Sequence, residues 1–78
     1  MSNYETTQIG NYIVETAKQK QWRNRNTNTI TFKQICDRFN ASLEFIRVNS
    51  KAIIEWLKSN IDVIDVDIFD DMFDIIVK

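Results

Sequence analysis

The stretch Thr31–Ile53 reads TFKQICDRFNASLEFIRVNSKAI, and its pattern predicts two helices joined by a tight turn. Thr31 can cap the first helix, and Gln34, three residues later, can reach back to complete a capping box. Asn40 suits the end of that helix, because Asn enters the left-handed backbone region more easily than most residues do. Ser42 is then a good N-terminal cap for the second helix.

Apolar residues recur at helical spacing in both predicted helices, which we place at 32–39 and 43–59. The first helix presents an apolar face made of Phe32, Ile35, Cys36 and Phe39. The second carries a broader apolar arc made of Phe45, Ile46, Val48, Ala52, Ile53, Trp56 and Leu57. Asn49 falls inside this arc, and three explanations are open. It is a buried amide with satisfied hydrogen bonds, it lies on a side that faces a second subunit, or the helix breaks at Asn49 and restarts at Ser50.

Certain residues of the two helices follow a known pattern, namely Ile35, Cys36, Phe39, the turn Asn40–Ala41, Ser42 and Ile46. Together they resemble the helix-turn-helix family over about a third of the chain. That family usually has Gly in the place of Asn40, and it prefers an apolar residue in the place of Ser50, where the chain departs from the pattern. The resemblance implies a fold more specifically than a function, because many such domains bind proteins rather than DNA.

Outside this stretch the sequence predicts a third helix and a C-terminal hairpin. The predicted elements are a helix over 4–22, a loop over 23–29, a short strand over 30–32, and strands over 61–68 and 72–77. Alternation through Ile64, Val66 and Ile68 supports the first hairpin strand, and Asp70–Asp71 supplies the turn. Gly10, inside the first helix, is interpreted as a site where another backbone approaches closely.

The predicted order is helix, strand, helix, helix, strand, strand, which defines an α+β fold in one domain over 1–78. This order is similar to the winged helix-turn-helix family, with the hairpin as the wing. In DNA-binding members of that family the wing commonly offers basic residues to the phosphate backbone. Here it carries Asp65, Asp67, Asp70, Asp71 and Asp74, so we expect the tip to avoid direct contact with DNA.

Length and composition indicate one small domain without catalytic machinery. The chain has 78 residues, of which 44% are hydrophobic and 27% charged, as in ordinary globular proteins. It has no His and one Cys, Cys36, so the usual nucleophile–base pairs, an internal disulfide and a Cys/His zinc site cannot be built. We therefore expect no enzymatic activity, no metal and no cofactor. A single thiol fits the cytoplasm, and no apolar run approaches the roughly 20 residues of a membrane span.

The charges are divided unevenly along the chain. Residues 1–59 hold nine bases and five acids, whereas 60–78 hold six acids and one base, for a total net charge of −1. Such a division suggests two surfaces with different partners.

Two functions are consistent with these features. The first is a small DNA-binding protein, a transcriptional regulator that acts as a dimer and is of a composition common in phages and mobile elements. Arg47 and Lys51 would approach the major groove, with Asn49 as an adenine reader if it is exposed. Lys33 and Arg38 would flank the groove, and Arg23 and Arg25 would contact phosphates.

The alternative is a protein-interaction adaptor or inhibitor that does not bind DNA. Its acidic hairpin would bind a basic protein or mimic a nucleic acid, or its strand edge would pair with a second copy. The candidate residues are Asp70, Asp71, Phe69 and Phe73. The two aromatic residues are either folded back onto the core or exposed as an adhesive patch.

Overall fold

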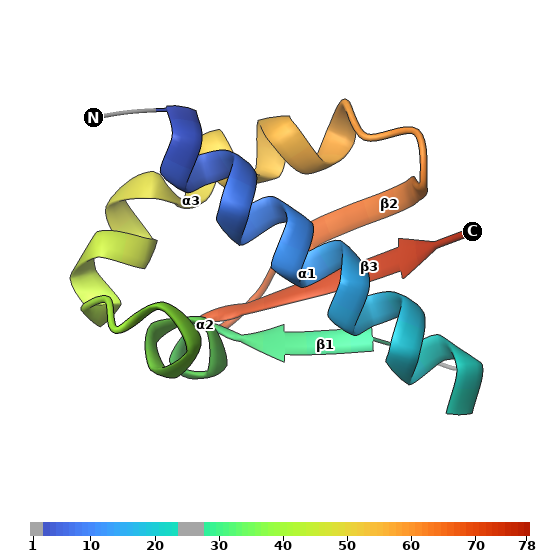
Figure 1. Ribbon diagram of the computed structural model, residues 1–78, viewed down its shortest axis with the longest axis horizontal. Helices are drawn as coiled ribbons and strands as arrows, with labels where there is room; N and C mark the ends of the chain where they lie inside the picture. The colour runs from blue at the N-terminus through green and yellow to red at the C-terminus, as the bar shows by residue number, and fades with distance from the viewer. Residues whose placement is uncertain (1–2, 24–27) are drawn as a thin grey trace.

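The computed structural model describes residues 3–23 and 28–78, and over these residues three helices and a three-stranded antiparallel sheet make up the fold (Figure 1). The elements are α1 Asn3–Arg23, β1 Asn28–Thr31, α2 Phe32–Phe39, α3 Leu43–Lys58, β2 Val63–Ile68 and β3 Met72–Val77. Their order is the predicted one. The main differences in bounds are that β1 begins at Asn28 rather than residue 30 and β2 at Val63 rather than residue 61.

Side-chain caps define the α2–turn–α3 segment as the sequence predicts. The Thr31 hydroxyl accepts a hydrogen bond from the Gln34 backbone N–H at 3.1 Å, and Gln34 Oε1 accepts one from the Thr31 N–H at 3.0 Å. Asn40 ends α2 in the left-handed conformation, with φ 54° and ψ 44°. The Ser42 hydroxyl then accepts from the Phe45 N–H at 3.1 Å and starts α3. These caps satisfy backbone groups that a helix end leaves unpaired.

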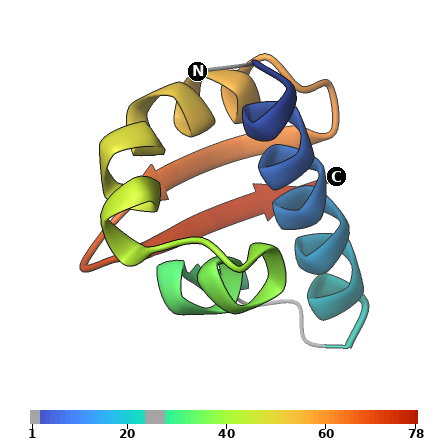
Figure 2. The same cartoon turned by 60° about the vertical axis from the view of Figure 1, so that its left-hand side comes forward.

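The sheet has the strand order β1-β3-β2, so the last strand of the chain lies in its centre. Ile30 pairs with Phe73 on one side of β3, and Ile68 pairs with Phe73 on the other. Side chains along β3 alternate between buried and exposed, which is the pattern of a sheet covered on one face only. Figure 2 shows the helices gathered on that covered face.

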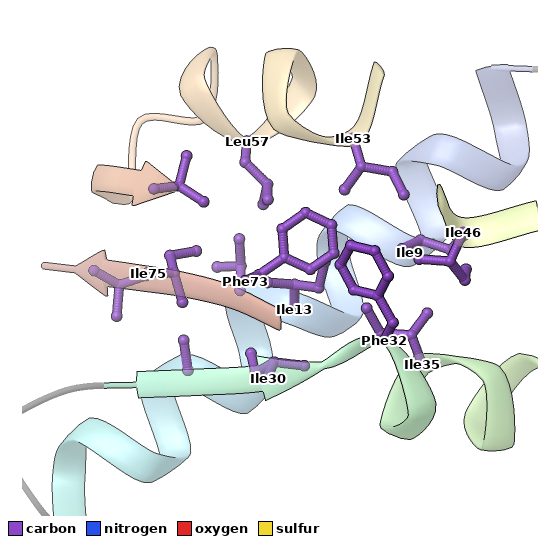
Figure 3. Close-up of a cluster of buried hydrophobic side chains, with 14 residues drawn as sticks. Ile9, Ile13, Ile30, Phe32, Ile35, Ile46, Ile53, Leu57, Phe73 and Ile75 are labelled. Atoms are coloured by element: carbon purple, nitrogen blue, oxygen red, sulfur yellow. The ribbon is translucent and has the colours of Figure 1, made fainter. Parts of the chain in front are cut away.

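The core lies between this covered face and the three helices (Figure 3). Its fully buried large side chains come from every element except β2: Ile13, Ile30, Ile35, Ile46, Ile53, Leu57, Phe73, Ile75 and Val77. The rings of Phe32 and Phe73 lie side by side near its centre, with centroids 5.0 Å apart. Phe73 was one of the candidate interaction residues, and that assignment is wrong, because its side chain is 0% exposed.

The predicted alternation in β2 is broken by a β-bulge. Val63 pairs with Val77 and Asp65 with Ile76, so Ile64 has no partner of its own on β3. One extra residue in a strand reverses the inward–outward alternation of all the residues on one side of it. Val66 and Ile68 therefore face the core as expected, whereas Ile64 is 62% exposed.

Gly10 permits a close approach, but by a side chain rather than by a backbone. The ring of Trp56 from α3 lies against it, and a Cβ added at Gly10 would lie 2.2 Å from Cε3 of that ring. Real carbon atoms do not approach so closely without displacement. At this point α1 and α3 therefore pack closely against each other.

Candidate functional site

The exposed side of α3 is the first candidate surface. Its exposed residues are Leu43, Glu44, Arg47, Val48, Lys51, Ala52, Glu55 and Lys58. The sequence placed Val48 and Ala52 in the apolar arc, but both are exposed, and the Val48 side chain is 72% accessible. We call Arg47, Val48 and Lys51 the α3 stripe. It extends from the fifth to the ninth of the 16 residues of α3 and offers two cations beside one apolar side chain.

Asn49 and Ser50 do not interrupt α3, which runs unbroken from Leu43 to Lys58. The Asn49 side chain is half-buried, and its Nδ2 donates a hydrogen bond to the Phe45 carbonyl at 2.8 Å. The Ser50 hydroxyl donates to the Arg47 carbonyl at 2.8 Å. Both side chains thus bond to the preceding turn of their own helix. The Asn49 amide thus uses one of its N–H groups within α3, and its side chain is not among the exposed ones of the helix.

The tip of the hairpin is tied to the α3 stripe by an ion pair. Arg47 Nε and Nη2 donate to the two carboxylate oxygens of Asp71 at 3.2 and 2.6 Å. The hydrogen bond to Arg47 holds the pKa of the Asp71 carboxyl below its ordinary value, and the pKa of Arg47 is raised for the same reason. In addition, the Phe32 N–H donates to the Asp71 carbonyl at 2.9 Å. The tip is therefore held both against Phe32, the first residue of α2, and against Arg47, the first residue of the stripe.

The turn itself is a two-residue hairpin loop. Asp70 and Asp71 both have positive φ, 52° and 58°, and Phe69 and Met72 exchange two backbone hydrogen bonds of 2.9 and 3.1 Å. These are the features of a type I′ turn, in which Asp is among the favoured residues. The two aspartates accordingly have a structural role in addition to any contact they make with a partner.

We expect Arg47→Gln to return the pKa of Asp71 toward its ordinary value of about 3.9. A lowered carboxyl pKa stabilises the fold above that ordinary value, and the stabilisation is lost as the pH falls through the folded-state pKa. The difference in unfolding free energy between wild type and variant should therefore be present at pH 7 and shrink below about pH 4. Carboxyl NMR titration and urea unfolding at the two pH values measure both effects. An unchanged Asp71 titration would show that the pair does not persist in solution.

The other residues predicted to contact DNA lie outside the α3 stripe. Lys33 is exposed on α2. The Arg38 guanidinium lies 5.9 Å from the centre of the Tyr12 ring and 5.4 Å from that of Phe39, which places it toward α1. Arg25 and the side chain of Arg23 lie outside the described residues. The structure thus joins Arg47 to the hairpin tip and directs Arg38 toward a different element.

The hairpin is the second candidate surface, and only part of it was recognised from sequence. Phe69 lies next to the acidic turn and is 73% exposed. Of the two alternatives given for the aromatic residues, folded onto the core or exposed, Phe69 therefore follows the second. Asp67 and Asp74, not among the candidate residues, lie directly opposite each other on β2 and β3, and both are exposed. Counting alternation outward from a two-residue turn at 70–71 would have identified these aspartates as facing outward and Phe73 as facing inward.

The residues that the structure describes offer little for metal binding or for nucleophilic chemistry. Among these residues, no three His, Cys, Asp or Glu side chains are grouped so as to hold a metal ion. Cys36 is half-buried against the core, and burial raises the pKa of its thiol. No helix in the ranges 3–23 and 28–78 is long and apolar enough to cross a membrane.

Comparison of the chain with protein-family models, with curated proteins and with solved structures finds no match.

Proposed function

We propose that the protein binds double-stranded DNA through the α3 stripe, as a winged-helix type of transcriptional regulator. The main supporting observation is that Arg47, Val48 and Lys51 lie exposed together at the fifth, sixth and ninth of the 16 residues of α3, a helix that begins at a short, capped turn. A helix that reads the major groove needs exposed donors near its N-terminal half. Arginine and lysine donate to guanine, and an apolar side chain suits a thymine methyl group.

The ion pair between Arg47 and Asp71 is compatible with this proposal. Both side chains are about half exposed, at 56% and 43%. Exposed pairs of this kind are weak and are screened by salt. A DNA phosphate carries the same sign of charge as the carboxylate and can replace it.

The acidic residues of the hairpin are divided between two faces, which further supports the proposal. Asp65, Asp67 and Asp74 are exposed on strands whose alternate residues, Val66 and Phe73, are buried beneath the helices. These three carboxylates consequently lie on the side of the sheet away from α3. Of the hairpin carboxylates, only that of Asp71 contacts the stripe, while Glu44 and Glu55 of α3 itself are exposed one helical turn before and after it.

A duplex-binding titration with paired variants tests the proposal. We expect Arg47→Ala/Lys51→Ala to weaken binding about tenfold or more, and to reduce the slope of log K against log salt by about two. The control is Lys58→Ala/Lys78→Ala, which removes the same charge from exposed positions outside the stripe and should change the affinity little. Fluorescence polarisation on mixed-sequence duplexes at several salt concentrations gives both quantities.

Equal losses in the two double variants would mean that binding depends on overall charge rather than on α3. Absence of binding at low salt would reject DNA binding altogether. If the protein acts as a dimer, its two α3 helices should contact half-sites about 34 Å apart, one turn of DNA. Measurement of mass in solution, with and without duplex, tests that part of the proposal.

A further inference from the structure

One face of the sheet is covered by none of α1, α2 and α3 in the described residues, and we call it the open face. Because Ile68 and Phe73 face the core, their neighbours Phe69 and Met72 face outward as a cross-strand pair at the tip. Asp67 and Asp74 form the next outward pair. Beyond the aspartates, the open face continues with Asp65, Ile76 and the bulged Ile64.

Like charges meet at the centre of the open face. Asp67 and Asp74 are register partners, so their side chains point the same way from adjacent strands. Within residues 6–20 and 29–78, the ion pairs involve Asp62 and Asp71, and neither Asp67 nor Asp74 has a cationic partner. Like charges directly opposite each other destabilise a sheet. Sequence choices that oppose stability are expected where function requires them.

Apolar side chains surround this pair and are also exposed. Phe69 is 73%, Ile64 62% and Ile76 46% accessible. Together with Ile61, at 79%, the hairpin and its entry carry four of the six large hydrophobic side chains that are exposed in the described residues. An exposed apolar surface combined with acid favours a partner that supplies apolar side chains and positive charge.

The edges of the sheet are not the point of attachment. The Val66 and Ile68 N–H groups donate to the preceding carboxylates, Asp65 Oδ1 and Asp67 Oδ1, at 3.0 and 2.9 Å. On β1, the Lys20 ammonium donates to the Thr29 carbonyl at 2.8 Å. Backbone groups occupied in this way are poor templates for an added strand. This arrangement counts against the pairing of strand edges between two copies.

We infer that the open face is a docking site for a basic amphipathic helix of a partner protein. Adjacent strands lie about 4.8 Å apart, so the outer strands of a three-stranded sheet are about 10 Å apart, close to the diameter of one helix. Lysine or arginine on such a helix would meet Asp67 and Asp74, while its apolar side would cover Phe69 and Ile76. A second copy docked face to face is disfavoured, because it would bring carboxylates against carboxylates. This inference is independent of DNA binding.

The test uses the full chain, labelled with ¹⁵N, and a synthetic 18-residue amphipathic helix of Leu, Ala and Lys. A scrambled peptide of the same composition is the control for charge alone. We expect the amphipathic peptide to bind at least tenfold more tightly than the scrambled one. The amide shifts should be confined to the surroundings of Asp67, Asp74 and Ile76.

The discriminating variant is Asp67→Asn/Asp74→Asn, with Asp37→Asn/Glu55→Gln as the control that removes two exposed carboxylates from the helices. The open-face variant should bind the peptide about tenfold more weakly while its melting temperature rises, because the repulsion has been removed. The control should bind like wild type. Equal affinity of all three proteins, or shifts centred on the helices, would overturn the inference. The inference would also be overturned if sedimentation showed the unmodified chain to be a dimer that dissociates when the peptide is added. The occupant of the open face would then be a second copy of the chain.

Discussion

Replacing Phe73 with Ala is expected to lower the free energy of unfolding by about 3–5 kcal/mol, the usual effect of removing a buried aromatic ring. The side chain is fully buried, packs on Phe32 at 5.0 Å, and lies on the central strand between Ile30 and Ile68. A chain of this length has a total stability of roughly 4–12 kcal/mol. The variant should therefore be partly unfolded at 37 °C, and urea unfolding at 10–25 °C measures the loss.

Phe69→Ala is the matched control, because it removes the same ring from the same hairpin. Phe69 is 73% exposed, so its loss should change stability by less than about 0.5 kcal/mol. Comparable losses in the two variants would contradict the assignment of Phe73 to the core and Phe69 to the open face.

Gly10→Ala is expected to destabilise the fold by about 1–3 kcal/mol, although Ala is the better helix former. The new Cβ would lie 2.2 Å from Cε3 of Trp56 and under 3.0 Å from two more ring atoms, so the ring or α1 must move. The same substitution at an exposed helical glycine would stabilise by about 1 kcal/mol. Thermal and urea unfolding of the single variant give the sign directly.

A double-mutant cycle separates the steric cause from others. In a Trp56→Ala background the ring is absent, and Gly10→Ala should then be neutral or stabilising by up to about 1 kcal/mol. The expected reversal of sign is specific to the contact between α1 and α3. If Gly10→Ala has the same effect in both backgrounds, the two helices do not meet at this point.

Local signals in the sequence were sufficient to predict the order of elements. The Thr31–Gln34 box, Asn40 at the helix end and the Ser42 cap are all interactions within a few residues, and each is present in the structure. The change from helical spacing to alternation after Asn60 likewise predicted the hairpin. These features could be predicted because short-range hydrogen bonds and periodicity determine them without knowledge of the tertiary fold.

Features that depend on tertiary contacts were not predictable in the same way. The pair between Arg47 and Asp71 joins residues 24 positions apart, and the bulge at Ile64 depends on how β2 fits against β3. Val48 was counted in a broad apolar arc, yet the buried residues Ile46, Ile53 and Leu57 occupy one narrow sector of α3, and Val48 lies about 200° around the helix from Ile46. A helical projection does not by itself say which sector of a broad apolar arc packs against the core.

The separation of charge along the chain becomes, in the fold, a separation between faces. The α3 stripe carries Arg47 and Lys51, whereas the open face carries Asp65, Asp67 and Asp74 on the other side of the sheet. In the account proposed here, one face approaches DNA and the other receives a basic helix. A regulator that binds DNA and a partner protein simultaneously requires such an arrangement.

The most direct test of this account is an NMR titration of the ¹⁵N-labelled chain with a DNA duplex. The account predicts that amide shifts concentrate between Ser42 and Lys51 and at the hairpin tip, where Asp71 releases Arg47. The amides of Asp67, Asp74 and Ile76 should remain unchanged. Shifts centred on those three residues, or no shifts at low salt, would contradict the assignment of the α3 stripe to DNA.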